Sequence, residues 1–322
     1  MNVPKSKSCK RIASHAGSWY SNQMSKLTSE LSKFMNSTKF EVSIPKSVFA
    51  KALISPHAGY AYSGPTAAYG YRVMKDTINR NQIKRIFVVG PSHHFYLKGC
   101  AMSEADLIET PLGHLSVDVP VKKEIERSGL FKKISLDQDE EEHSLELQFP
   151  FIKFISGSKD VKVVNIMVGD MNNQYVKKIS NLLKPYFLDD ESLFIFSSDF
   201  CHWGQRFGYQ EDFRQSTREQ IWEGIQRLDL NGIDLIENKN ESGFESYLHK
   251  TKNTICGKNP IRLLMSLMND FDIKDKFTLK NLHYTQSEKA KTKFDCSVSY
   301  ASLLVYKSVS YTHLTLPTTP YV

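Results

Sequence analysis

Residues 193–204 read LFIFSSDFCHWG and contain a buried strand followed at once by a polar segment. The apolar run 193–196 is typical of a strand covered on both faces. Asp199, Cys201 and His202 follow within a few positions. Ligands of open α/β sheets bind beyond the carboxyl ends of the strands. A strand that ends on an acid, a thiol and an imidazole therefore predicts a chemical site at that edge of the sheet.

Similar apolar runs elsewhere predict the rest of the sheet. Three further strands are expected at 51–55, 85–89 and 161–168. Helical patterns follow the first of them, from Pro65, and the third, over 171–187. This alternation predicts the α/β class, with a central, mostly parallel sheet flanked by helices.

The sequence pattern of the second half of the chain predicts a helical layer and two more strands. Residues 211–270 are mostly helical in pattern and are expected to cover the sheet. Strand-like runs at 277–284 and 297–306 predict two closing strands, which would make the sheet mixed. The segment DEEEHSLELQFPF, residues 139–151, predicts a helix whose first turn carries four acids as capping charge.

The length of 322 residues, with 40% hydrophobic and 24% charged residues, is sufficient for a large folded core. The motifs are spread along the chain, so a single domain is expected over residues 1–309. The Thr- and Pro-rich stretch 310–322 lacks periodicity and is expected to be an unstructured end or an extension added by cloning.

Charge and cysteine content exclude several classes of protein. The net charge is +7, but the basic residues are interleaved with acids, which argues against a nucleic-acid partner. No apolar run is long enough to cross a membrane, and the first residues lack the apolar core of a secretion signal. Five scattered cysteines without a CxxC pair predict reduced thiols. We expect a cytoplasmic protein, with the nucleus as a second location.

Two histidine loops follow predicted strands. In SPHAGYAYSG, residues 55–64, the strand ends before Pro56 and the loop presents His57. In GPSHH, residues 90–94, adjacent side chains of extended backbone point in opposite directions, so only one of His93 and His94 should face the site. A single loop histidine is commonly a surface residue, so the argument depends on several of them meeting.

An acid and a cysteine extend this set. A turn after residue 197 would bring Asp199 close to His202, where the carboxylate could orient a histidine. In NTICGKNPI, residues 253–261, Cys256 precedes a predicted helix, where the helix dipole favours a thiolate, although a single cysteine is often only a small buried apolar residue. His143 and Glu146, three residues apart on a predicted helix, are second-ranked candidates for lining the site.

Together these residues favour a metal or redox site. Imidazole suits copper, iron or zinc, and a thiolate favours copper or zinc over magnesium or calcium. HExxH, P-loop, GxGxxG and GxSxG patterns are absent, which argues against zincin, nucleotide-phosphate, dinucleotide and serine-hydrolase chemistry.

Several motifs in fixed order closely resemble those of the Memo family. They are SHAGSWY at 14–20, SPHAGYAYSG, GPSHH, EEHSLELQ at 141–148, SSDFCHWGQRFGY at 197–209 and NTICGKNPI. The resemblance covers residues 13–306 and does not include the tail. It implies a fold similar to the class III extradiol dioxygenases, with the site at the strand ends.

The resemblance also implies roles for individual residues. His57, His93 and Cys256 match the family's metal-binding positions, and His202, with Asp199 close by, matches its remaining site histidine. The related dioxygenases hold iron with two histidines and a carboxylate. A cysteine in the third position makes ring cleavage doubtful.

Two functional hypotheses follow. In the first, His57, His93 and Cys256 bind a copper or iron ion, while His202 acts as a fourth ligand or as a base with Asp199, in a metal-dependent oxidoreductase or a metal-handling protein. The family is linked to copper-dependent oxidant production, iron handling and receptor-driven cell motility. In the second, a non-enzymatic signalling module binds a phosphopeptide at the same residues, as animal relatives do.

Overall fold

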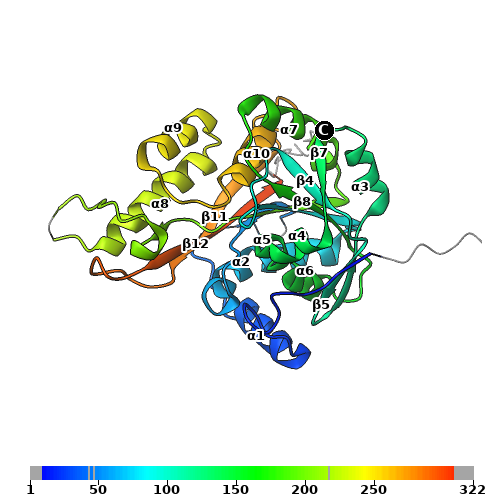
Figure 1. Ribbon diagram of the computed structural model, residues 1–322, viewed down its shortest axis with the longest axis horizontal. Helices are drawn as coiled ribbons and strands as arrows, with labels where there is room; N and C mark the ends of the chain where they lie inside the picture. The colour runs from blue at the N-terminus through cyan, green and yellow to red at the C-terminus, as the bar shows by residue number, and fades with distance from the viewer. Residues whose placement is uncertain (1–8, 43, 46–47, 217, 308–322) are drawn as a thin grey trace, which may run out of the picture.

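The computed structural model describes residues 9–42, 44–45, 48–216 and 218–307 (Figure 1). Within these residues the centre of the molecule is a nine-stranded mixed sheet in the order β10-β12-β2-β9-β3-β8-β4-β7, with β11 also paired to β12. Helices cover both faces of the sheet (Figure 1). A separate small sheet is formed by β1, β5 and β6. The predicted α/β architecture with a central sheet flanked by helices is confirmed.

The strands of the described residues are β1 Lys10–Arg11, β2 Ala50–Ser55, β3 Arg85–Pro91, β4 Cys100–Ser103, β5 Leu107–Thr110, β6 Gly113–Ser116, β7 Phe131–Ile134, β8 Lys162–Val168, β9 Ser192–Ser197, β10 His202–Trp203, β11 Phe277–Gln286 and β12 Ser297–Lys307. The helices are α1 Met24–Asn36, α2 Tyr60–Arg80, α3 Val119–Glu126, α4 Leu136–Glu141, α5 His143–Glu146, α6 Phe149–Ser156, α7 Asn173–Leu188, α8 Ile221–Glu237, α9 Glu241–Thr251 and α10 Lys258–Met268, with a short 3-10 turn η1 at Gln205–Phe207.

The four strands predicted first form the parallel centre of the sheet. β2 pairs with β9, β9 with β3, and β3 with β8, all in parallel. β12 runs antiparallel to β2 and to β11, so the two predicted closing strands are present and make the sheet mixed. The short strands β4 and β7, which the sequence pattern did not reveal, extend the other edge.

Alternate residues of the central strands enter two separate cores. On β3, Phe87 and Val89 pack in the core with α7, α8 and α10, whereas Ile86 and Val88 pack in the core with α1, α2 and α6. Because successive side chains of a strand point to opposite faces, a strand covered on both faces must be apolar throughout. The continuous apolar runs in the sequence follow from this arrangement.

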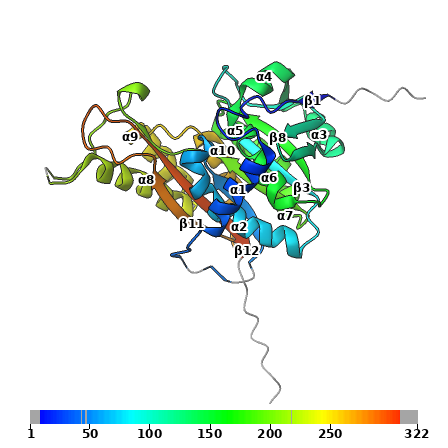
Figure 2. The ribbon, with the colours of Figure 1, turned by 90° about the horizontal axis from the view of Figure 1, so that it is seen from below.

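The predicted helical layer is present as α8, α9 and α10. α10 packs on α7 and against β3 and β9, next to the central strands. α8 and α9 lie with part of the β11–β12 hairpin at one end of the molecule, away from α3 and β3 (Figure 2).

Two sequence-based expectations about helices were wrong. α2 begins at Tyr60, so Pro65 lies inside it and not at its start. Residues 139–151 form parts of three short helices instead of one, and Glu140 and Glu141 stand at the end of α4, whereas Asp139 lies in its first turn. Burial against a distant cation, described next, holds Asp139 in that position. Glu142 does cap a helix, since it accepts a hydrogen bond from Ser144 N–H at the start of α5.

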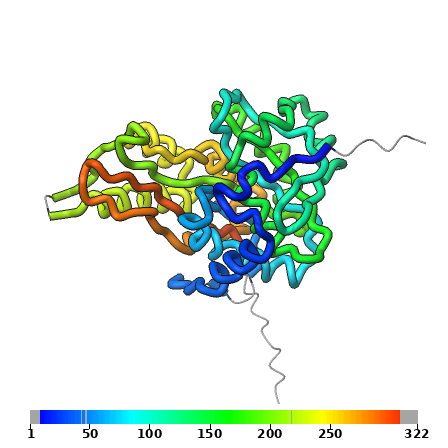
Figure 3. The backbone as a smooth tube through the Cα atoms, turned by 60° about the horizontal axis from the view of Figure 1, so that its bottom comes forward, coloured from blue at the N-terminus to red at the C-terminus, as the bar shows by residue number. Residues whose placement is uncertain are grey.

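Arg11 attaches the N-terminal segment to this region, where the segment lies across the body of the molecule (Figure 3). Its side chain is fully buried. Nη1 donates to Glu146 Oε2 at 2.6 Å, and Nη2 donates to the carbonyl oxygens of Asp139 at 2.8 Å and Glu142 at 3.1 Å. Nε lies 3.2 Å from Asp139 Oδ1. One cation thus compensates two buried carboxylates and fixes α4 relative to α5.

The expected tail at 310–322 lies outside the described residues. Among the helices that are described, none combines the length and apolarity needed to cross a membrane.

Replacing Arg11 tests the contribution of this buried cation to stability. Arg11→Met should lower the free energy of unfolding by about 3 to 5 kcal/mol, because Asp139 and Glu146 would remain buried without their partner. Lys10→Met is the matched control. Its pair with Glu109 is partly exposed, so the loss should stay below about 1 kcal/mol. Urea unfolding of both variants measures the difference, and equal losses would contradict this assignment.

Candidate metal centre

His57 lies directly beyond the end of β2, in a position set by the neighbouring strand. Ser55 of β2 is in register with Ser197 of β9. Beyond this pair, the His57 backbone N–H donates to Asp199 Oδ1 at 2.8 Å. The His57 side chain is only 1% exposed. The two strand exits are therefore tied together where the parallel strands end.

The hydrogen bonds of His57 determine which ring nitrogen carries its proton. Nδ1 lies 2.7 Å from Ser197 Oγ, and that hydroxyl donates its single hydrogen to the Ser144 carbonyl oxygen at 2.7 Å. His57 Nδ1 must therefore be the donor to Ser197, and Nε2 keeps its lone pair. Burial, followed by the charges of His93 and other nearby histidines, lowers the pKa of His57 well below its usual value. The ring is thus neutral and able to act as a ligand.

His93 follows β3 and is held by a buried carboxylate. Its backbone N–H donates to Glu142 Oε2 at 2.6 Å, and its Nδ1 lies 2.8 Å from Glu142 Oε1. A carboxylate only accepts hydrogen bonds, so Nδ1 carries the hydrogen and Nε2 is directed elsewhere. His94 has no such partner and is exposed, with its ring edge-on to His143. Of the two adjacent histidines, His93 is the one that belongs to this group.

The His93–Glu142 pair is strongly polarised. Burial opposes the charge on His93, but hydrogen bonds and charges from Cys256 and Glu142 outweigh it and raise the pKa of His93 to about 10. Burial likewise opposes ionisation of Glu142, yet the hydrogen bond and charge of His93 lower the pKa of Glu142 to about 2. A proton is therefore bound tightly at His93.

Cys256 reaches the same place from the loop before α10. Gly257 allows this close approach, since a Cβ there would lie 2.3 Å from Ser198 Cβ. The Gly257 N–H donates to Ser198 Oγ at 3.1 Å, and the Asp199 N–H points to Cys256 Sγ at 3.3 Å. Burial and the charge of Asp199 raise the pKa of the thiol, while His93 acts in the opposite direction.

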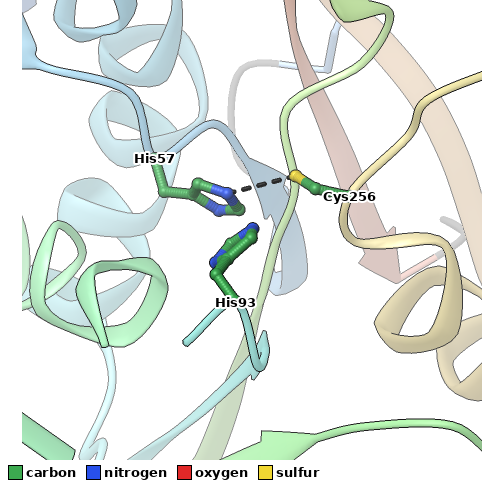
Figure 4. Close-up of side chains that lie close together, drawn as sticks. All are labelled: His57, His93 and Cys256. Atoms are coloured by element: carbon green, nitrogen blue, oxygen red, sulfur yellow. Dashed lines mark hydrogen bonds between the residues drawn. The ribbon is translucent and has the colours of Figure 1, made fainter. Parts of the chain in front are cut away.

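His57, His93 and Cys256 face one another (Figure 4). One ring nitrogen of each histidine and the Cys256 sulfur all lie within 4.8 Å of one another. His57 Nε2 is 3.1 Å from Cys256 Sγ, and the two rings meet edge to face at 5.2 Å. Metal–nitrogen bonds of about 2.0 Å and metal–sulfur bonds of about 2.3 Å are compatible with this spacing after small shifts. The donor set fits a metal ion that accepts nitrogen and sulfur ligands.

The other two predicted site residues lie beside this group. His202 Nδ1 is 2.9 Å from the Phe200 carbonyl oxygen, and the His202 ring is edge-on to Phe207. His202 is not a member of the ligand groups found among the described residues. Asp199 is buried, which raises its pKa, and one of its carboxylate oxygens binds the backbone of His57. The catalytic roles expected for Asp199 and His202 stay predictions.

Sequence reasoning missed the carboxylate that orients His93. Glu142 was interpreted as a cap only, but it binds both the backbone and the ring of His93. The second-ranked candidates His143 and Glu146 contact different partners. His143 stacks on His93 with ring centroids 4.5 Å apart and planes 22° apart. The Glu146 carboxylate instead accepts hydrogen bonds from Arg11 and Tyr20. The motif EEHSLELQ was the available signal, because two of its three acids, Glu142 and Glu146, are four residues apart.

His93, Glu142 and His143 also form a group with donor atoms within 4.8 Å. A metal ion lies in the plane of an imidazole ring that binds it, and two nearly parallel stacked rings do not share such a point. Burial, together with the charge of His93, lowers the pKa of His143 to about 3. Glu142 therefore serves better as the acceptor that orients His93 than as a ligand of a second resident ion.

Comparison with known proteins agrees with this arrangement. The family described as Memo-like protein matches residues 11–304. The chain is 40% identical over 298 residues to the protein memo-1 homolog of Caenorhabditis elegans, which covers 92% of this chain and 82% of that protein. A MEMO1 family protein of Schizosaccharomyces pombe is 38% identical over 313 residues, with 91% of this chain and 97% of that protein covered. Human protein MEMO1 is 37% identical over 295 residues, with 91% and 96% covered. The match extends over nearly all of the described residues, and the chain belongs to the Memo-like protein family.

Proposed function

We propose that this Memo-like protein binds a copper or iron ion through His57, His93 and Cys256. The observation that carries the proposal is that an acceptor fixes Nδ1 of both histidines. Ser197 and Glu142 each accept the Nδ1 hydrogen, so Nε2 is the ring nitrogen of each histidine that can bind the ion, and His93 must first release the proton it holds there. When bound, such an ion would supply redox chemistry, and a thiolate ligand favours copper.

The surrounding residues prepare the site for this role. Glu142 makes His93 a stronger base, as carboxylates commonly do for metal-binding histidines. Gln148 Nε2 donates to Ser197 Oγ at 2.8 Å and to the Pro56 carbonyl oxygen at 3.0 Å, which holds the His57 loop. The proposed setting is the cytoplasm or nucleus, where the thiol of Cys256 stays reduced.

Metal analysis of matched variants tests the proposal. Cys256→Ser and His93→Ala should each lose at least about tenfold in copper affinity, because each removes one ligand from the site. Cys9→Ser and His94→Ala are the controls, since they remove the same chemical groups outside the group of three. Binding is measured by competition with a chelator and by metal content after purification without nickel. Unchanged stoichiometry and affinity in both ligand variants would rule out the site.

The pH dependence of metal affinity follows from the protonation of His93 and Cys256. Both groups hold a proton near neutral pH, because the pKa of His93 is about 10 and that of the thiol is raised above its usual value. Metal binding must release these protons, so affinity should rise from pH 6 to pH 8 by about tenfold per pH unit for each proton released. Calorimetry in buffers of different ionisation enthalpy counts the protons.

Glu142→Gln provides a second readout of the same effect. Removing the carboxylate should lower the pKa of His93 and weaken the pH dependence of metal affinity. An affinity independent of pH in the unmodified protein would contradict the assignment of His93 as a ligand.

A second candidate function is binding of a phosphopeptide at the same residues. The positive charge of His93 in the metal-free protein, together with its partial exposure, favours an anionic ligand there. A phosphotyrosine peptide should then bind metal-free protein and be displaced by copper. Fluorescence anisotropy measures this competition, and the unphosphorylated peptide is the control. If the phosphorylated peptide binds no better than the control, the signalling-module hypothesis fails.

A further inference from the structure

Four histidines surround the largely buried ring of His143 next to the proposed metal centre. The His143 ring centroid lies 4.5 Å from that of His93, 5.4 Å from His57, 5.8 Å from His94 and 6.0 Å from His15. His57 is almost completely buried and His15 is partly exposed, whereas His93 and His94 are exposed. His143 therefore contacts the buried His57 as well as His15 and His94, which we call the outer histidines.

The Nδ1 atom of His143 is buried and has no hydrogen-bond partner. The carboxylate oxygen Oε1 of Glu142 is 3.6 Å from it, which exceeds hydrogen-bond distance. Leaving a buried polar atom unpaired costs about 1 to 3 kcal/mol. An apolar ring of the same shape would avoid this cost, so the nitrogen is not explained by packing and is available to a ligand.

The outer histidine His15 is held in the same manner as His93. Its backbone N–H donates to Glu146 Oε1 at 2.8 Å, and its Nδ1 lies 3.0 Å from Glu146 Oε2. The carboxylate accepts the Nδ1 hydrogen, so Nε2 is the ring nitrogen of His15 that can bind a metal ion. Two carboxylates, one at each end of α5, thus fix Nδ1 of His93 and of His15 and leave Nε2 of each ring as the position for a metal ion.

The aromatic ring of Trp19 covers the outer side of His143. Their ring centroids lie 4.4 Å apart, and Trp19 itself is partly exposed. The face of an aromatic ring attracts a cation weakly and does not replace the nitrogen ligands of a metal ion. The surroundings of His143 thus contain several weak donors and not a complete ligand set.

We propose that His143 transfers a metal ion, with copper(I) as the most suitable class, between the outer histidines and the group of His57, His93 and Cys256. This inference rests on the proposed metal-binding function. The transfer is an exchange of ligands, in which one imidazole nitrogen replaces another without any change in oxidation state. The near-parallel stacking of His143 on His93 leaves no point that both rings can bind, so the exchange would run between His143 and His57, whose rings meet edge to face with centroids 5.4 Å apart.

The rate of copper loading tests the proposal on the full chain. Copper(I) held by a coloured chelator is mixed with reduced, metal-free protein, and transfer is followed by stopped-flow absorbance. His143→Phe keeps a flat ring against His93 but removes the nitrogen. It should slow loading by at least about tenfold while the equilibrium affinity changes by less than about threefold. His15→Gln, at the outer end, should also slow loading and provides a second variant if His143→Phe folds poorly.

His283→Phe is the matched control, because His283 stacks on Tyr69 in a different part of the fold and should leave the rate unchanged. Loading at the unmodified rate in both His143→Phe and His15→Gln would overturn the transfer role. A loss of equilibrium affinity in His143→Phe as large as that in His93→Ala would also overturn it, since His143 would then be a ligand of the centre. If the unmodified protein binds no copper, the proposed function itself fails.

Discussion

The parallel pairing of β2, β9 and β3 is the constraint on which the site depends. Parallel strands in register leave the sheet at the same level, so the residues that follow them are neighbours in space although far apart in sequence. Ser55 and Ser197 are aligned, and His57 and Asp199 each stand two residues beyond them. β3 lies on the other side of β9 and delivers His93 to the same edge. Local sequence alone could not produce this convergence.

The one-turn helix α5 fixes the orientation of the histidine rings at this edge of the sheet. Glu142 and Glu146, at its two ends, fix the rings of His93 and His15 in the same way. Two buried carboxylates would repel one another and lose hydration, but Arg11 donates to Glu146 and to the backbone of Glu142. The N-terminal segment therefore contributes to the site through electrostatics, without supplying a residue of the ligand group.

Much of this arrangement could be predicted from sequence because the signals were local. Continuous apolar runs indicated strands covered on both faces, and the polar segments after them indicated one edge of the sheet. The remaining features depend on contacts between distant residues. Arg11 and Glu146 are separated by 135 positions, and nothing near either residue indicates the other. The role of Cys256 came from family resemblance, since a cysteine before a helix is compatible with simple packing.

Contacts between residues far apart in the sequence also explain the two wrong predictions about helices. The acids of residues 139–142 were expected to begin one helix, but they are divided between α4 and α5, and a buried cation from the start of the chain holds Asp139 and Glu146 of the two helices together. Pro65 matched a helix start by type, but Gly59 and a hydrogen bond from the Tyr60 N–H to the Trp19 carbonyl oxygen begin the helix earlier. In both cases tertiary contacts outweighed the local preference.

The charges at the site also bear on which ion the proposed metal centre would select. Glu142 stays ionised, so the His93 ring beside it attracts positive charge at Nε2, whether that charge is a proton or a metal ion. The Glu142 carboxylate strengthens the binding of a proton and of a metal ion alike, so it cannot discriminate between them. Discrimination must come from Cys256, because a hard proton and a soft metal ion differ most in their affinity for sulfur. The cysteine that distinguishes this site from a ligand set of two histidines and a carboxylate is thus the residue that favours a soft ion over the proton already held there.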